Sequence, residues 1–193
     1  MARTKEFNPV DALEAAVNVF WRLGYEHTSL DALMQEMGVA RQSLYDTFGD
    51  KRSLYLKALA HYRDGNHAML RDLFAGNKPV KEGLAKLLFD LSHESRAEQE
   101  RGCLLLSANM ERTADDKEVA DFLRDDQRTV ERIFRDALKR AQERGEIAKE
   151  KDIVALARFF VATIQGMRAI ARLSHDRKTL ENIATVALNS LES

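Results

Sequence analysis

The stretch between residues 28 and 51 constrains the fold more than any other part of the chain. Apolar residues recur at helical spacing on both sides of Gly38. Because glycine tolerates the left-handed conformation, Gly38 can end the first helical segment within one residue. Small and polar residues open the second segment. The pattern predicts a helix-turn-helix, and the second helix of such a motif is the one that enters a DNA major groove.

A first helix is expected over about residues 9–23, because Asn8 is a good N-cap and Pro9 suits the first turn. Its apolar stripe would consist of Val10, Leu13, Val17, Phe20, Trp21 and Gly24. The second helix should run from Ser29 to about Met37 with Thr28 as its cap. Its buried stripe would be Leu30, Leu33, Met34 and Met37.

The third helix should span about residues 40–46, with Leu44 and Phe48 pointing inward. After a break at Gly49, Asp50 would cap a long helix over about 51–74. Further helices are predicted at about 80–97, 101–112, 116–143, 151–175 and 177–191. The expected fold is therefore all-α with about nine helices. It divides into a three-helix head (residues 1–50) and a helical effector and dimerisation domain (51–193), with the helix over 51–74 as connector.

Several features bear on the cellular compartment. The N-terminus lacks the apolar run of a signal peptide. The most apolar stretch, residues 153–173, contains Arg158, Arg168 and Arg172, which argues against a membrane span. The single cysteine, Cys103, cannot form an internal disulfide. A cytoplasmic protein without a membrane partner is expected.

The helix predicted over 151–175 is apolar around most of its surface, at Ile153, Val154, Leu156, Phe159, Phe160, Val161, Ile164, Met167, Ile170 and Leu173. Such a helix must bury more than one face. The helix after it supplies Leu180, Ile183, Val186, Leu188 and Leu191. Two such pairs would form a four-helix interface about a two-fold axis, so we expect a homodimer through residues 151–191. The alternative is a monomer in which the apolar helix is simply central.

Charge does not by itself favour nucleic acid. The net charge is −1. The first 55 residues hold six Lys and Arg (positions 3, 5, 22, 41, 51 and 52) against eight Asp and Glu (positions 6, 11, 14, 26, 31, 36, 46 and 50). Many DNA-binding proteins are basic. The case for DNA must therefore depend on where individual cations lie.

The chain resembles the TetR family of transcriptional repressors, most closely over residues 8–60. The resemblance is carried by Phe20-Trp21-Arg22-Leu23-Gly24-Tyr25, Thr28-Ser29-Leu30, Met37-Gly38-Val39, Leu44-Tyr45, Phe48-Gly49 and Lys51 with Leu54. The opening of the 101–112 helix, Gly102-Cys103-Leu104, resembles one broad subset of the family. The resemblance implies an all-α homodimer. An effector bound in its C-terminal domain would change the separation of two DNA-reading heads.

Arg41 is the best candidate for reading bases, because its guanidinium can bind guanine O6 and N7. Gln42 can pair with adenine N6 and N7 or contact a phosphate, and Ser43 is small enough to permit close approach. By resemblance, Tyr45 contacts a phosphate and Lys51 anchors the DNA backbone. Asp46 departs from the family pattern, and it either accepts from a cytosine amino group or faces solvent.

Four further residues are candidates for DNA contact. Thr28 and Ser29 lie at a helix N-terminus, where phosphates bind. Arg3 and Lys5 form a short basic arm that could enter the minor groove. The alternatives are that Arg41 is a solvated charge, that Tyr45 is partly core, and that Arg3 and Lys5 form a nonspecific tail.

The effector site should lie among the helices of residues 51–175. The candidate lining residues are aromatic, methionine and leucine side chains with a few polar groups, which suits a small and mostly apolar ligand. They are Met69, Phe74, Leu88, Leu91, Cys103, Ser107, Met110, Phe134, Phe159, Thr163, Gln165 and Met167. Any of them could instead be an ordinary core residue. Cys103 could act as a redox or electrophile sensor, or simply as a small buried hydrophobe.

The sequence thus favours a ligand-responsive, DNA-binding regulator, a repressor released from its operator by a small effector. Nucleophile elbows, phosphate-binding loops and metal-ligand spacings are absent from the sequence, so no enzyme, metal or cofactor is expected. The alternatives are a helical protein that uses the same motif to dock another protein, and a redox-sensing regulator acting through Cys103.

Overall fold

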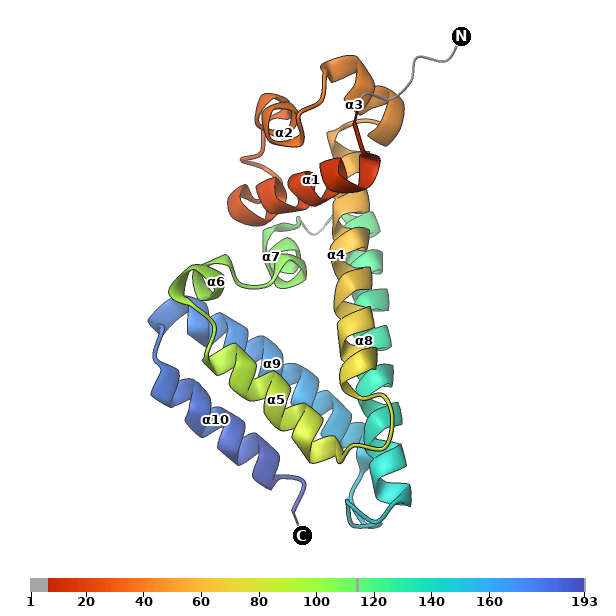
Figure 1. Cartoon of the computed structure of the whole chain (residues 1–193), viewed down its shortest axis with the longest axis vertical. Helices are drawn as coiled ribbons and strands as arrows, with labels where there is room; N and C mark the ends of the chain where they lie inside the picture. Colours follow the sequence, from red (N-terminus) through yellow and green to blue (C-terminus); the bar gives the residue numbers. More distant parts are fainter. Residues whose placement is uncertain (1–6, 114, 193) are drawn as a thin grey trace. The chain divides into compact units, whose positions relative to one another are not determined.

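The computed structural model describes residues 7–113 and 115–192, and over these residues the chain is all-α (Figure 1). The ten helices of this part are α1 (Pro9–Leu23), α2 (Leu30–Met37), α3 (Arg41–Phe48), α4 (Lys51–Leu73), α5 (Val80–Ser92), α6 (Arg96–Arg101), α7 (Leu104–Glu111), α8 (Lys117–Glu143), α9 (Ile153–Ser174) and α10 (Arg177–Asn189). The predicted all-helical class is confirmed.

Local capping explains where the first two helices begin. The Asn8 side chain accepts a hydrogen bond from the backbone N–H of Val10 at 2.9 Å, and Pro9 opens α1. Ser29, not Thr28 as the sequence suggested, caps α2 by accepting from the N–H of Ala32 at 3.1 Å. Thr28 is instead buried, and its hydroxyl donates to the Gly24 carbonyl oxygen at 2.5 Å. Thr28 therefore ties the turn that leads into α2.

Gly38 ends α2 in the left-handed region, with φ of 64° and ψ of 33°. This conformation strains other residues, so the prediction of a sharp turn at Gly38 is confirmed. The apolar stripe of α1 differs from the expected one, with which its buried face shares Val17 and Phe20. Val10 is exposed, because the buried face of α1 consists of Ala12, Ala16, Val17, Val19 and Phe20.

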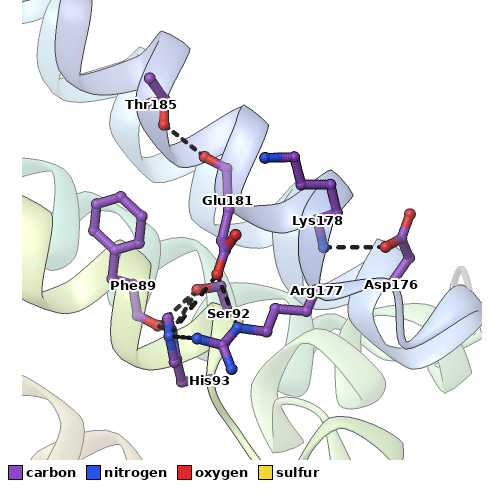
Figure 2. A network of polar contacts seen from close by, with 8 residues as sticks. All are labelled: Phe89, Ser92, His93, Asp176, Arg177, Lys178, Glu181 and Thr185. Carbon is purple, nitrogen blue, oxygen red and sulfur yellow. Dashed lines mark hydrogen bonds and ion pairs between the residues drawn. The ribbon is translucent and has the colours of Figure 1, made fainter.

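The prediction of a single helix over residues 80–97 is wrong, because the helix is interrupted between Ser92 and Arg96. Ser95 starts α6 with a capping box: the N–H of Glu98 donates to its hydroxyl, and its own N–H donates to the Glu98 carboxylate at 2.7 Å. At the end of α5, the interruption is stabilised by His93, which Figure 2 shows. His93 Nδ1 lies 2.7 Å from the Phe89 carbonyl oxygen, so its ring closes the last turn of α5.

The start of α10 is fastened to this same turn. Arg177 contacts His93 Nε2, and its Nε donates to Glu181 Oε1 at 2.8 Å (Figure 2). Asp176 caps α10 by accepting from the N–H of Lys178 at 3.0 Å. Polar contacts therefore fix where α5 ends and where α10 begins.

The helices pack into two units. Among the described residues, the first unit comprises 7–66 and 103–123, and the second comprises 67–102 and 124–192. The helices α4 and α8 contribute residues to both. The sequence predicts a functional boundary after residue 50, whereas the packing groups α7 and the first residues of α8 with the N-terminal helices. Each unit has its own core.

The core of the first unit is built around Phe20, Leu33, Leu44, Leu54 and Leu59, all at most 1% exposed. The core of the second unit is formed by α5, α9 and α10, which lie side by side, with residues of α4 and α8 (Figure 1). Its centre consists of Leu84, Leu88, Phe134, Phe160 and Met167, again at most 1% exposed. The buried area of these side chains supplies most of the stabilising free energy of each unit.

By length and composition, α9 is the one helix of the described chain that is apolar enough to cross a membrane. A central helix of a folded domain passes the same test. The helix packs against α5, α6 and α10. Two of its arginines form ion pairs, Arg158 with Glu131 at 3.0 Å and Arg168 with Glu94 at 3.4 Å. These contacts assign α9 to the core of the second unit.

Candidate DNA-binding surface

The helix α3 presents a polar face to solvent. Leu44 and Phe48 anchor it, since both are at most 4% exposed, and Phe7 packs on Phe48 with ring centroids 6.4 Å apart. Arg41 and Gln42 are exposed on its outer face. The orientation predicted for these side chains is confirmed.

Tyr45, 41% exposed, also lies on the outer face of α3. Ser43, which lies between Gln42 and Leu44, is half-buried. The backbone N–H groups at the start of α3 have no side-chain cap, since the capping residue is Ala40. Acceptors such as phosphate oxygens can therefore approach this helix end.

Both of the best candidate readers have a carboxylate beside them. The guanidinium of Arg41 lies 3.7 Å from the Asp31 carboxylate on α2. Gln42 Nε2 donates to Asp46 Oδ1 at 2.8 Å. Asp46, which departs from the family pattern, therefore holds the Gln42 side chain one turn earlier on the same helix.

The first residue of α4, Lys51, is a cation of the first unit. Lys51 Nζ lies 4.4 Å from the centroid of the Tyr25 ring, a cation–π contact that positions the ammonium group. Asp50 caps α4, as predicted, by accepting from the N–H of Ser53 at 2.7 Å. Hydrogen bonds from the Ser53 backbone and side chain hold the pKa of Asp50 below its ordinary value.

Lys57 is a residue that sequence reasoning missed. Its Nζ donates to the Phe48 carbonyl oxygen at 2.9 Å and so satisfies the C-terminal end of α3. A lysine that follows a short helix by nine residues gives no local signal of this contact. Lys57 therefore helps to fix the position of α3 on α4.

The other predicted DNA-contact residues are placed less favourably. The Thr28 hydroxyl is buried and engaged by Gly24, so it does not face solvent. Ser29 is exposed, but its hydroxyl accepts the capping hydrogen bond of α2. Arg3 and Lys5 lie outside the described residues.

Two carboxylates, Glu111 on α7 and Asp116 directly before α8, bind Tyr25 and Arg52 of the first unit. The N–H of Tyr25 donates to Glu111 Oε2 at 3.2 Å. The guanidinium of Arg52 makes two hydrogen bonds to Asp116, one of them at 2.8 Å. Asp116 in turn caps α8 by accepting from the N–H of Val119 at 3.2 Å. The bidentate pair links the first turn of α4 to the first turn of α8.

This pair is electrostatically strong for a partly buried contact. The hydrogen bonds from Arg52 hold the pKa of Asp116 below its ordinary value, and the same bonds raise the pKa of Arg52. A cavity of about 100 Å³ adjoins the pair and is lined by Tyr25, Tyr55 and Arg112 among others. Burial in this region also raises the pKa of Tyr55. The pair spans 64 residues of sequence, so no local pattern could have indicated it.

The predicted effector residues fall into both units. Cys103, Ser107 and Met110 belong to the first unit, and the remaining nine belong to the second. Met110 is 74% exposed and Phe159 is 42% exposed. The buried members of the second unit are Phe74, Leu88, Leu91, Phe134 and Met167. Thr163 is half-buried and Gln165 is exposed.

An open groove of about 820 Å³ lies between α4 and α5 in the second unit. Its wall includes Met69, Leu73 and Leu87, and its rim carries charged residues such as Asp72 and Lys86. Met69 is the one predicted effector residue in this wall. The composition of the effector site therefore stays a prediction.

Cys103 is half-buried and packs against the core of the first unit, directly before α7. Its thiol is free. This placement is that of a small apolar side chain at a helix end. Its role as a sensor stays a prediction.

Comparison with known proteins agrees with this geometry. Residues 12–58 match the family described as bacterial regulatory proteins, tetR family, and residues 84–187 match the tetracyclin repressor-like C-terminal domain. The chain is 33% identical to the HTH-type transcriptional regulator YezE of Bacillus subtilis (strain 168), over all of both chains. It is 31% identical to the HTH-type transcriptional repressor ComR of Escherichia coli (strain K12), over 96% of this chain and 90% of that protein.

A solved structure has a similar sequence identity to this chain. A cysteine mutant of the TetR family transcriptional regulator CifR, complexed with 26-base-pair double-strand operator DNA, is 32% identical. It superposes with a TM-score of 0.85 over 97% of this chain and 99% of that one. The first of the two family matches covers the helices α1 to α3 and the start of α4, where the exposed polar face lies. The chain belongs to the TetR family of bacterial transcriptional regulators, which are DNA-binding proteins and not enzymes.

Proposed function

We propose that this protein is a dimeric repressor that binds an operator through α3 and leaves it when a small, mostly apolar effector binds. The observation that carries the DNA-binding part is the outer face of α3. There Arg41, Gln42 and Tyr45 are exposed on a helix fixed by Leu44 and Phe48. The structural similarity to CifR, which was solved with operator DNA, supports this assignment.

Within this proposal the residues have distinct roles. Arg41 offers a forked donor to guanine O6 and N7, and Gln42 pairs with adenine. Tyr45 and Lys51 bind phosphates and set the register of α3 in the groove. Ser29 at the start of α2, and Arg3 and Lys5 before α1, add backbone or minor-groove contacts.

The dimer proposal is supported by an exposed stripe on α9. Ala155, Phe159, Ala162, Gly166, Ala169 and Leu173 are all exposed, and they recur at alternating intervals of four and three residues. That spacing places them on one side of the helix. Val186 on α10 adds a further exposed apolar side chain, at 68% exposure. A second copy of the chain would cover this surface, because small residues allow two helices to approach closely.

The effector proposal is supported by side-chain chemistry. Phe74, Phe134 and Met167 lie in the core of the second unit, and such a lining suits an apolar molecule. An effector acts as an inducer only if it binds the DNA-free state more tightly than the DNA-bound state. A small apolar inducer should therefore both raise the melting temperature of the free protein and lower its affinity for the operator.

The decisive experiment measures binding to a duplex from the protein's own upstream region and to a shuffled duplex of equal length. The expected dissociation constant for the specific duplex is about 10 nM or lower at moderate salt. The slope of log K against log salt should be steep, about −0.9 for each phosphate contact. A helical docking protein, the competing function, would bind both duplexes equally weakly. Equal binding would refute the repressor.

A further inference from the structure

The hydrogen bond between Gln42 and Asp46 determines which groups Gln42 can offer to DNA. The two residues lie one turn apart on α3, and both side chains are exposed. The donor is Gln42 Nε2 and the acceptor is Asp46 Oδ1, at 2.8 Å. An ionised carboxylate has no hydrogen to donate, so the amide must turn its nitrogen and not its oxygen toward Asp46.

We propose that Asp46 is a positioning residue that makes Gln42 select adenine over guanine. The inference rests on the proposed function, because it requires that α3 reads base edges. A glutamine amide has two N–H donors and one acceptor oxygen. With one N–H bound to Asp46, one N–H and Oε1 remain for the DNA.

This remaining pair of groups matches only one purine. Adenine offers an amino donor at N6 and an acceptor at N7 in the major groove, so it pairs with one amide N–H and one amide oxygen. Guanine offers two acceptors, O6 and N7. Two amide N–H groups are needed to satisfy both, and Asp46 holds one of them. The carboxylate itself also repels the acceptors of guanine.

The second carboxylate of this surface has a different consequence. Asp31 lies 3.7 Å from Arg41, but a guanidinium has five N–H donors. A neighbouring carboxylate therefore leaves Arg41 enough donors for both acceptors of guanine. Asp31 thus provides a matched control, since its removal deletes the same charge from the same head without touching Gln42.

The test begins with the full-length wild-type dimer and a pool of random duplexes, from which the bound sequences are selected and counted. Gln42→Ala identifies the base position that Gln42 reads, as the position whose preference is lost. Asp46→Ala and Asp46→Asn are then measured on duplexes carrying adenine or guanine at that position. Asp31→Ala serves as the control, and circular dichroism verifies that all variants are folded.

For Asp46→Ala we expect the ratio of affinities for adenine and guanine at that position to fall by at least about threefold, because a hydrogen bond to a charged group has been removed. Asp46→Asn should lose less of the preference, since its amide oxygen can still accept. Asp31→Ala should leave the ratio at this position unchanged.

Four outcomes would overturn the inference. Asp46→Ala could leave the ratio within threefold of wild type, or it could shift the affinity for every sequence equally, which would mean that only its charge matters. Gln42→Ala could leave all base preferences intact, which would refute a base-reading Gln42 while the proposed function stands. A wild-type protein that enriches no sequence at all would refute the proposed function and this inference with it.

Discussion

The two units of this protein differ in how many aromatic rings they pack together and in the surfaces that they leave exposed. The first unit is rich in packed rings. Tyr55 contacts Phe20 and Tyr25 with centroids 5.0 and 4.7 Å apart, and Trp21 lies 4.6 Å from Tyr62. The second unit has fewer ring contacts, Phe74 with Phe134 and Phe159 with Phe160, and is built from long amphipathic helices.

The outer surfaces differ as well. The first unit presents polar side chains that already have internal partners, such as Arg41 beside Asp31 and Gln42 beside Asp46. The second unit presents the apolar stripe from Ala155 to Leu173. A surface of the first kind suits a polar partner whose groups must be matched one by one, and one of the second kind suits another copy of the chain.

The net charge of −1 is compatible with such a polar surface. A head that binds DNA need not be basic overall if its cations are aimed at the groove and its carboxylates orient them. Here the carboxylates of Asp31 and Asp46 lie beside Arg41 and Gln42. The cost in bulk attraction would be offset by better-defined donors and acceptors.

The largest expected effects come from the two cores. Phe20→Ala and Phe160→Ala should each lower the free energy of unfolding by about 3–5 kcal/mol, because both rings are fully buried. Urea unfolding followed by circular dichroism measures this. At temperatures where both variants are folded, Phe20→Ala should impair DNA binding more, and Phe160→Ala should impair dimerisation more. The same functional loss in both would contradict distinct roles for the units.

The next effect tests the stripe on α9. Replacing both Phe159 and Leu173 by Asp should weaken dimerisation by about 100-fold or more, equivalent to about 2.7 kcal/mol, because two charges would be buried in the interface. Analytical ultracentrifugation measures the dimer dissociation constant. Lys139→Asp on α8 changes the net charge by the same amount and should have little effect. A dimer that survives the double change would locate the interface elsewhere.

The third effect separates reading from anchoring. Arg41→Ala should cost about 1–3 kcal/mol on the specific duplex and relax the preference at one base position. Lys51→Ala should weaken binding to all sequences about equally and reduce the salt dependence. Fluorescence anisotropy with specific and shuffled duplexes distinguishes these patterns. Equal, sequence-independent losses in both variants would contradict the assigned roles.

The fourth effect concerns Arg52 and Asp116. Asp116→Asn should lower the free energy of unfolding at neutral pH by about 1–2 kcal/mol, since an ion pair becomes a contact between the Arg52 cation and a neutral amide. The pKa of Asp116 is lowered in the folded state. The stabilisation is therefore present above the ordinary carboxyl pKa, and it is lost as the pH falls through the lower, folded value. Urea titrations should show that the gap between wild type and variant narrows as the pH falls below the ordinary carboxyl pKa of about 3.9. A gap that does not change with pH would exclude this electrostatic origin.

The smallest effect tests the corrected cap of α2. Ser29→Ala should reduce the free energy of unfolding by about 1 kcal/mol, because the N–H of Ala32 loses its acceptor. Thr28→Ser keeps the buried hydroxyl at the neighbouring position and serves as the control. A Ser29→Ala variant as stable as the wild type would contradict the cap at Ser29.

Much of the head was predictable because its signals are local. The spacing of Leu44 and Phe48, the caps at Asn8 and Asp50, and the turn at Gly38 each act within a few residues. The break between Ser92 and Arg96 was missed because apolar spacing alone could not outweigh the Ser95–Glu98 capping box and the ring of His93. A closer reading of Ser95 and Glu98 could have found the box in the sequence.

The sequence by itself determined the helical class, the helix-turn-helix and the outward face of α3, since helical periodicity and capping depend on neighbours along the chain. The tertiary structure alone decided that α7 and the start of α8 pack with the head, that Arg52 meets Asp116, and that Lys57 closes the end of α3. Contacts between distant segments depend on how whole helices pack. That packing is determined by all of the core side chains together and not by any short motif.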